Sequence, residues 1–148
     1  MGNARSRTRR NVDLARLSDQ HRVMLRIRAF EEIALAAAGA GLVTGAIHPC
    51  IGQEAVAVGI CANLGRADYL FATHRGHGHP LAKGADPAAM MCELFGRQGG
   101  VCGGKGGSMS LTSLDRSCRT PFAANTTRQA VLKMAMSRIE TPRSGLPV

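Results

Sequence analysis

A glycine-rich stretch from Gly96 to Gly107 constrains the fold of this chain most, because seven of its twelve residues are glycine. Glycine inside a helix or strand forfeits backbone entropy and adds no side chain to a core. A flexible linker would carry serine among its glycines, whereas this stretch carries Val101, Cys102 and Lys105. We therefore expect a loop that forms part of a site for a phosphorylated ligand.

A histidine cluster, THRGHGHP at residues 73–80, precedes this loop. His74, His77 and His79 have no carboxylate or cysteine at a zinc-ligand spacing, so we predict no metal site here. Arg75 offers a planar fork of donors that suits a phosphate, and the flanking glycines let backbone N–H groups come close. A surface turn with solvated histidines is the alternative that this segment leaves open.

The net charge of +9 lies at the two ends of the 148-residue chain. Residues 1–28 carry eight arginines against two aspartates, and residues 113–148 carry six basic against two acidic residues, whereas residues 29–112 are nearly neutral. With four Phe, one Tyr and no Trp, the stacking platforms of single-strand binders are missing. We expect no nucleic-acid partner and, since no apolar run is long enough to cross a bilayer, no membrane partner.

The five cysteines are odd in number and form no CxxC pair, which predicts reduced thiols in a cytoplasm. The first ten residues, MGNARSRTRR, are rich in arginine and free of acidic residues. This composition favours a solvated arm, with a mitochondrial transit peptide as the alternative. We expect a cytoplasmic protein of bacterial type, or a mitochondrial matrix protein if the alternative holds.

Hydrophobic periodicity predicts a long first helix, capped by Ser18 or Asp19 and running to about Ala38. Its apolar stripe consists of the regularly spaced residues Val23, Ile27, Phe30 and Ala34. Gly39 and Gly41 are expected to end it. The following loop, with glycines and a proline, should present His48.

Further elements are expected between residues 52 and 139. A second helix, from near Gly52 to about Leu64, is apolar on every side and needs neighbours that missing chain or a partner subunit would supply. Residues 68–73 (DYLFAT) read as a short buried strand that delivers His74 and Arg75 at its end. A third helix spans about Asp86 to Phe95. A short amphipathic helix, capped by Thr126 or Thr127, is expected to carry its apolar residues between 132 and 139.

These elements predict an α/β fold, mostly helical, with one short buried strand and a glycine-rich loop. We expect three regions: a basic disordered arm at residues 1–16, the folded part at 17–112, and a divergent basic tail at 113–148.

Four sequence blocks in order resemble one known family. The blocks are MLRIRAFEE (24–32), GAIHPCIGQEAVAVG (45–59), DYLFATHRGHGHPLAKG (68–84) and MMCELFGRQGGVCGGKGGSM (90–109). They resemble the N-terminal portion of the alpha subunit of thiamine-diphosphate-dependent 2-oxo-acid and acetoin dehydrogenases. The resemblance implies a truncated thiamine-diphosphate-binding fold.

The resemblance also implies roles for individual residues. His48, His74 and Arg75 match residues at the cofactor diphosphate, and an Arg fork with imidazole donors suits that task. His77 matches the histidine near the active-site channel and is the candidate catalytic residue. The matching cofactor-binding loop continues through Lys105, Gly106, Gly107 and Ser108. The resemblance implies that backbone amides and the basic side chain of this loop line the approach to the site.

The implied function is oxidative cleavage or decarboxylation of acetoin or a 2-oxo acid such as pyruvate. The resemblance implies acyl transfer to a lipoyl-bearing acyltransferase, and a beta subunit as partner in an α2β2-type assembly. Thiamine diphosphate would serve as electron sink. From about residue 113 the resemblance ends, and the GDG-to-Asn segment that holds Mg²⁺ is absent. We therefore expect a truncated chain that is inactive alone, with a non-catalytic subunit-interaction or decoy module as the alternative.

Overall fold

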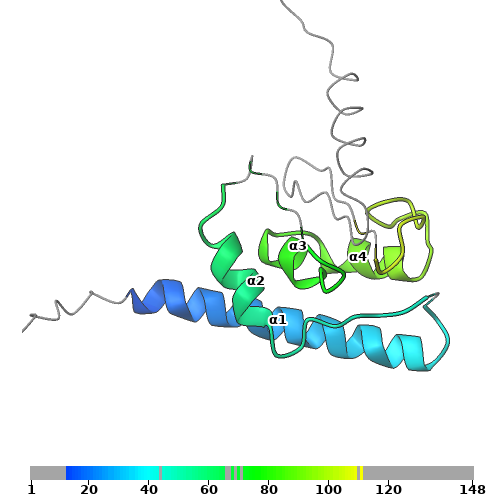
Figure 1. The fold of residues 1–148 in the computed structure, drawn as a ribbon, viewed down its shortest axis with the longest axis horizontal. Coiled ribbons are helices and arrows are strands. Elements are labelled where there is room, and N and C mark those ends of the chain that lie inside the picture. Colours follow the sequence, from blue (N-terminus) through cyan, green and yellow to red (C-terminus); the bar gives the residue numbers. More distant parts are fainter. Residues whose placement is uncertain are drawn as a thin grey trace, which may run out of the picture.

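The computed structural model describes residues 13–43, 45–65, 68, 70, 72–109 and 111. Four helices follow one another in this part of the chain: α1 (Leu14–Gly39), α2 (Glu54–Cys61), α3 (Gly78–Ala82) and α4 (Pro87–Leu94). The long α1 lies along one side, and the three shorter helices contact it from the other (Figure 1). The three shorter helices, joined by loops, therefore lie on one side of a single supporting helix, α1.

Helix α1 begins earlier than its sequence pattern predicts. Its N-cap is Asp13, whose carboxylate accepts the backbone N–H of Arg16 at 3.0 Å, so the expected cap at Ser18 or Asp19 is wrong. The helix also takes in residues 14–16, which were assigned to the disordered arm; residues 1–12 lie outside the described part. The predicted stripe is confirmed, since Ile27, Phe30 and Ala34 are buried.

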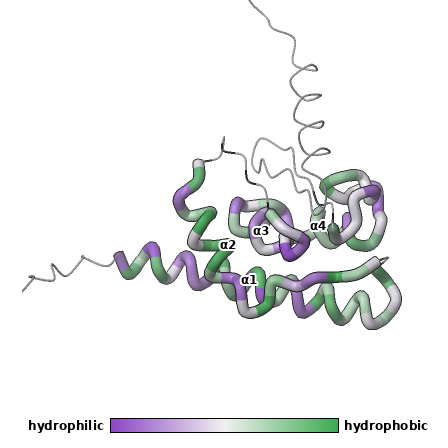
Figure 2. The backbone as a smooth tube through the Cα atoms, viewed as in Figure 1, coloured by the Kyte–Doolittle hydropathy of each residue, from purple (hydrophilic) through white to green (hydrophobic). Residues whose placement is uncertain are grey.

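Helix α2 is shorter than predicted, at Glu54–Cys61 rather than 52–64. The Asn63 side chain donates to the carbonyl of Gly59 at 2.7 Å, and such a side-chain bond competes with continued helix. Most of the α2 tube carries the hydrophobic colour in Figure 2. Ala57 and Val58 face the core, but Val56 and Ile60 are 56% and 44% exposed. One apolar face of α2 is therefore exposed, which is consistent with the prediction that this helix needs further chain or a partner subunit to cover it.

The predicted strand at residues 68–73 is not formed at the positions that the structure describes. Asp68, Leu70, Ala72 and Thr73 have no strand conformation, while residues 69 and 71 lie outside the described part. A strand requires a partner for its backbone groups, and none of the described residues forms one. The described part is helix and loop, and the α/β class remains a prediction.

Helix α3 was not predicted, because its sequence contains glycine and proline. Pro80 is the third residue of this one-turn helix, where a missing N–H costs little because the first turn has no internal acceptor. Helix α4 is confirmed: Asp86 accepts the N–H groups of Ala88 and Ala89 at 3.1 and 3.3 Å, and Pro87 follows as first helical residue.

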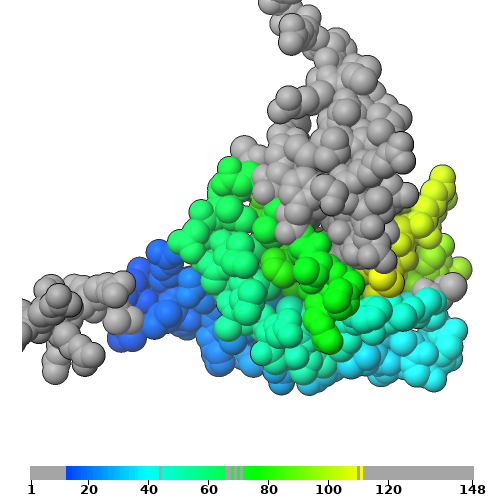
Figure 3. Space-filling view, viewed as in Figure 1, coloured from blue at the N-terminus to red at the C-terminus, as the bar shows by residue number. Residues whose placement is uncertain are grey.

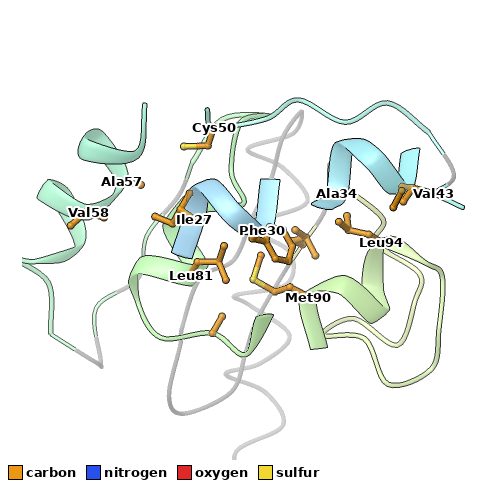
Figure 4. Packing of buried hydrophobic residues seen from close by; sticks show 13 residues of the cluster. Ile27, Phe30, Ala34, Val43, Cys50, Ala57, Val58, Leu81, Met90 and Leu94 are labelled. Carbon is orange, nitrogen blue, oxygen red and sulfur yellow. The ribbon is translucent and has the colours of Figure 1, made fainter. Parts of the chain in front are cut away.

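The core lies between α1 and the three shorter helices. Ile27 and Phe30 of α1 point toward Leu81 of α3 and Met90 of α4 (Figure 4). In the space-filling view α2 lies over the middle of α1, and the yellow glycine-rich loop lies toward the C-terminal end of α1 (Figure 3). Hydrogen bonds from Cys50 and His77 to Glu31 hold the loops at residues 45–53 and 72–77 against α1, and Ser108 of the loop at 95–109 contacts His77.

Two further sequence expectations concern the whole chain. Within the described residues, no helix combines the length and apolarity that crossing a bilayer requires. The four described cysteines, Cys50, Cys61, Cys92 and Cys102, form no disulfide. The expected tail at 113–148, with its short helix and Cys118, lies outside the described part.

Candidate functional site

Three predicted diphosphate-binding residues come together in space. The His48 and His74 rings lie edge to face, with centroids 4.9 Å apart. The guanidinium of Arg75 donates to the Pro49 carbonyl at 3.0 Å. We call His48, Pro49, His74 and Arg75 the first cluster. It joins two loops that are 26 residues apart in the sequence.

The first cluster contains polar groups that are available to a ligand. His74 and Arg75 are exposed and His48 is half-buried. The Nδ1 atom of His48 is buried and has no hydrogen-bond partner among the described residues. A guanidinium beside two imidazoles, one with an unpartnered buried nitrogen, suits an anionic ligand such as a diphosphate.

A second cluster is fully buried and consists of Glu31, His77 and Ser108. The Nδ1 atom of His77 lies 2.9 Å from Oε2 of Glu31. Its Nε2 atom lies 3.1 Å from both the carbonyl oxygen and Oγ of Ser108. Because the His77 side chain has no exposed surface and both ring nitrogens are engaged, the ring does not open onto the surface of the described part. Its catalytic role remains a prediction.

Glu31 also connects the second cluster to the first. Its Oε1 atom accepts the backbone N–H of Cys50 at 2.9 Å, and Cys50 directly follows the Pro49 carbonyl that binds Arg75. Burial, together with the charges of Glu31 and Glu54, raises the pKa of the Cys50 thiol to about 11. The thiol is therefore protonated at neutral pH and is not a nucleophile.

The glycine-rich loop wraps around an internal anion, Glu93 of α4. The Glu93 carboxylate accepts the backbone N–H groups of Cys102, Gly104, Gly106 and Gly107, at distances of 2.7, 2.8, 2.6 and 3.3 Å. Burial disfavours the charge, but these four donors outweigh it and lower the pKa of Glu93. The expectation that these amides face a ligand is corrected: they bind a side chain of this chain.

The remaining predicted positions fall into different surroundings. Lys105 is exposed on the loop between the engaged amides of Gly104 and Gly106. His79 is half-buried, and burial lowers its pKa. Among the described residues, no group of three or more histidine, cysteine or acidic side chains has the arrangement of a metal site.

A groove of about 480 Å³ lies apart from these clusters, between the first turns of α1 and the ends of α2 and α3. Its polar lining includes Asp13, Arg16, Asp19 and Gln20. None of the predicted site residues lines it, and the Arg16 side chain already donates to the Ala62 carbonyl at 3.2 Å. We assign it no role in the candidate site.

Glu31 and Glu93 were missed by the sequence reasoning. For each residue the sequence contains a signal of burial. Glu31 falls between Ile27 and Ala34 on the buried stripe of α1, and Glu93 falls within an apolar run of α4. A carboxylate at a buried helical position requires hydrogen-bond donors. That requirement indicates a polar partner but does not identify it.

Comparison with known proteins places these features in a family context. The family model described as dehydrogenase E1 component matches residues 22–135. The expectation that the resemblance ends near residue 113 is therefore wrong.

Individual relatives cover a smaller part of the chain. The subunit alpha of acetoin:2,6-dichlorophenolindophenol oxidoreductase from Bacillus subtilis is 50% identical over 93 residues, 63% of this chain. The subunit of the same name from Cupriavidus necator is 46% identical over 105 residues, 71% of this chain. The pyruvate dehydrogenase E1 component subunit alpha of Zymomonas mobilis is 48% identical over 109 residues, 72% of this chain. The matched part is 28%, 32% and 30% of the length of these relatives.

Proposed function

This chain belongs to the dehydrogenase E1 component family, and on that premise we propose that it forms the diphosphate-binding part of an alpha subunit. The subunit would belong to a thiamine-diphosphate-dependent dehydrogenase. The names of the relatives favour acetoin or pyruvate as substrate.

One observation carries the proposal: the first cluster combines an arginine and two histidines at one place. Arg75 is held by the Pro49 carbonyl at 3.0 Å, and His74 packs on His48 with centroids 4.9 Å apart. The guanidinium donors that are not bound to Pro49, together with Nδ1 of His48, would bind diphosphate oxygens. These contacts would hold and orient the diphosphate group.

The residues divide the task of holding the cofactor. Bound thiamine diphosphate would supply an electron sink for cleavage of a carbon–carbon bond next to a carbonyl group. Arg75, His48 and His74 would hold its diphosphate, and Lys105 would add positive charge from the loop. The described residues contain no group suited to Mg²⁺, so we propose no metal ligand among them.

The partners follow from the same proposal. A beta subunit would complete an α2β2-type assembly, and a lipoyl-bearing acyltransferase would accept the acyl group. Several large apolar side chains remain exposed on α1 and α2, among them Leu25, Ile33, Val56 and Ile60, and they favour a subunit contact.

Calorimetry with thiamine diphosphate and Mg²⁺ tests the cofactor assignment on the full chain. Arg75→Ala should weaken binding roughly 10- to 100-fold, because it removes hydrogen bonds between a cation and an anion. Arg26→Ala is the matched control, since Arg26 is an exposed arginine of α1 outside both clusters. Equal losses in the two variants would contradict a specific diphosphate site.

A non-catalytic subunit-interaction module is the second candidate, and the exposed apolar residues of α1 and α2 favour it. This candidate predicts no binding heat when thiamine diphosphate is added at saturating concentration. It also predicts that the double variant Val56→Ser, Ile60→Ser has a lower affinity for a dehydrogenase beta subunit. Arg75→Ala should leave that affinity unchanged. Binding of thiamine diphosphate to the parent chain would exclude this candidate, which assumes a module that binds no cofactor.

A further inference from the structure

The two oxygens of the buried Glu31 carboxylate contact two segments, one that adjoins the first cluster and one that carries His77 of the second cluster. Oε1 of Glu31 accepts the Cys50 N–H, and Oε2 lies 2.9 Å from Nδ1 of His77. We propose that Glu31 is a positioning residue of the candidate site. It holds the segment that carries His48, and it fixes the ring of His77 against Ser108.

The first half of this role depends on covalent proximity. Cys50 is one residue from Pro49 and two from His48, so anchoring its N–H anchors the backbone that carries the imidazole and the Arg75 acceptor. Glu31 itself lies in the middle of α1, between the buried residues Ile27 and Ala34. The long helix therefore provides a rigid base for a loop segment that has no regular structure of its own.

The second half of the role depends on where protons sit. A carboxylate oxygen accepts hydrogen bonds, so the proposed arrangement places the ring proton of His77 on Nδ1, directed at Oε2 of Glu31. This contact sets the ring plane and directs Nε2 toward Ser108, 3.1 Å away. Ser108 ends the glycine-rich loop, so Glu31 fixes the position of that end through His77.

Burial shows why stability alone does not explain the pair. Glu31 and His77 both have no exposed surface. A buried carboxylate is costly unless it is fully hydrogen-bonded, and an apolar pair of similar volume often packs with equal or better stability. Orientation of the two loops is the property that an apolar pair would lose.

The role of the two loops in cofactor binding rests on the proposed function. The hydrogen-bond arrangement around Glu31 does not depend on that function. Glu31→Gln tests the arrangement, because the introduced amide has one accepting and one donating end. If its oxygen keeps the Cys50 N–H, its NH₂ group faces Nδ1 of His77. The ring must then give up the Nδ1 proton and carry it on Nε2, where the Ser108 carbonyl accepts it.

Imidazole ¹⁵N spectra of the full chain read out this change. We expect a protonated Nδ1 for His77 in the parent chain and an unprotonated Nδ1 in Glu31→Gln, with His77→Asn identifying the signal. Glu32→Gln is the matched control, because Glu32 is the exposed neighbour on α1. An unprotonated Nδ1 in the parent would overturn the proposal. So would a Glu31→Gln variant in which neither the protonation of His77 Nδ1 nor the protection of the Cys50 thiol, measured next, changes.

Thiol labelling followed by peptide mapping gives a second measurement that does not need a resolved spectrum. Cys50 is 2% exposed, and Glu31→Gln should accelerate its labelling relative to Cys92 by about tenfold, as expected from weakening a buried hydrogen bond. If Glu31→Gln unfolds the chain, all thiols label fast, and His77→Asn decides instead. Asparagine keeps a donor toward Glu31, so Cys50 should stay protected; fast labelling confined to Cys50 would contradict an anchor at Glu31.

Calorimetry on the same variants separates this inference from the proposed function. Glu31→Gln should weaken thiamine diphosphate binding about tenfold, since it loosens the segment of His48. A parent chain with a protonated Nδ1 and no cofactor binding would overturn the function and leave the positioning role. Cofactor binding that survives Glu31→Gln unchanged, without a tautomer change, would overturn the positioning role and leave the function.

Discussion

The backbone N–H of Gly106 donates to Oε1 of Glu93 over 2.6 Å, so an acidic side chain of α4 occupies the concave side of the glycine-rich loop. Three further backbone N–H groups of the loop donate to the same carboxylate. The loop thus has the geometry of an anion-binding nest whose anion belongs to the chain itself.

Replacing Glu93 with glutamine should destabilise the chain at neutral pH by about 1–3 kcal/mol, because one accepting end becomes a donor facing loop N–H groups. The folded-state pKa of Glu93 is lowered from its ordinary value of 4.5. Its contribution is therefore complete above pH 4.5 and declines as the pH falls through the lower folded-state pKa. Urea midpoints measured across acidic pH should fall steeply for the parent and less steeply for Glu93→Gln. Parallel curves would contradict this assignment.

Alanine at Gly104 and at Gly103 separates backbone strain from steric overlap. Both glycines have positive φ, +77° and +67°, so each alanine should cost about 1–2 kcal/mol of backbone energy. Only at Gly104 would the new Cβ lie 2.5 Å from the carbonyl carbon of Gly96, whereas at Gly103 nothing lies within 4 Å. Denaturant unfolding should show a larger loss for Gly104→Ala, by about 1–3 kcal/mol. Equal losses would show that the loop accommodates the methyl group.

Gly78 at the start of α3 packs against Cys50, and alanine there should destabilise by about 1–3 kcal/mol. Its Cβ would lie 2.8 Å from Sγ of Cys50. Cys50→Ala removes that sulfur. The double variant should therefore lose less stability than the sum of the losses in the two single variants. Thermal unfolding of the four proteins measures the coupling. Additive effects would place the clash at Ala57 or Ile27, the next nearest neighbours.

The ion pair between Arg28 and Glu54 joins α1 to α2 at 2.5 Å, and its two sides should respond unequally to mutation. The Arg28 hydrogen bond lowers the pKa of Glu54, whose side chain is 6% exposed against 43% for Arg28. Arg28→Met leaves a buried carboxylate without its partner, so it should destabilise more than Glu54→Gln, which leaves a solvated guanidinium. The difference should shrink at acidic pH, where Glu54 is protonated in Arg28→Met. Chemical unfolding at two pH values measures it, and a larger effect of Glu54→Gln would contradict the prediction.

Local signals in the sequence were sufficient for some elements. Asp86 followed by Pro87 identified the start of α4, and the spacing of Ile27, Phe30 and Ala34 identified the buried face of α1. The cap of α1 was misplaced because Asp13, Ser18 and Asp19 are all competent caps, and local pattern does not rank them. Helix α3 escaped prediction because its glycine and proline are helix breakers in most positions, although the first turn tolerates both.

The sequence by itself determined the family and the residue types of the candidate site, because these are carried by short sequence blocks. That His48 lies beside His74 was implied only by the family resemblance, and the tertiary structure placed the two rings in contact. Only the tertiary structure decided where the carboxylates act. Glu31 and His77 are 46 residues apart in the sequence, and the fold brings their side chains to within 2.9 Å. The fold also directs the backbone N–H groups of the glycine-rich loop at the Glu93 carboxylate. Hydrogen-bond partners of buried charges are chosen by packing of distant segments, and that choice leaves no periodic mark in the chain.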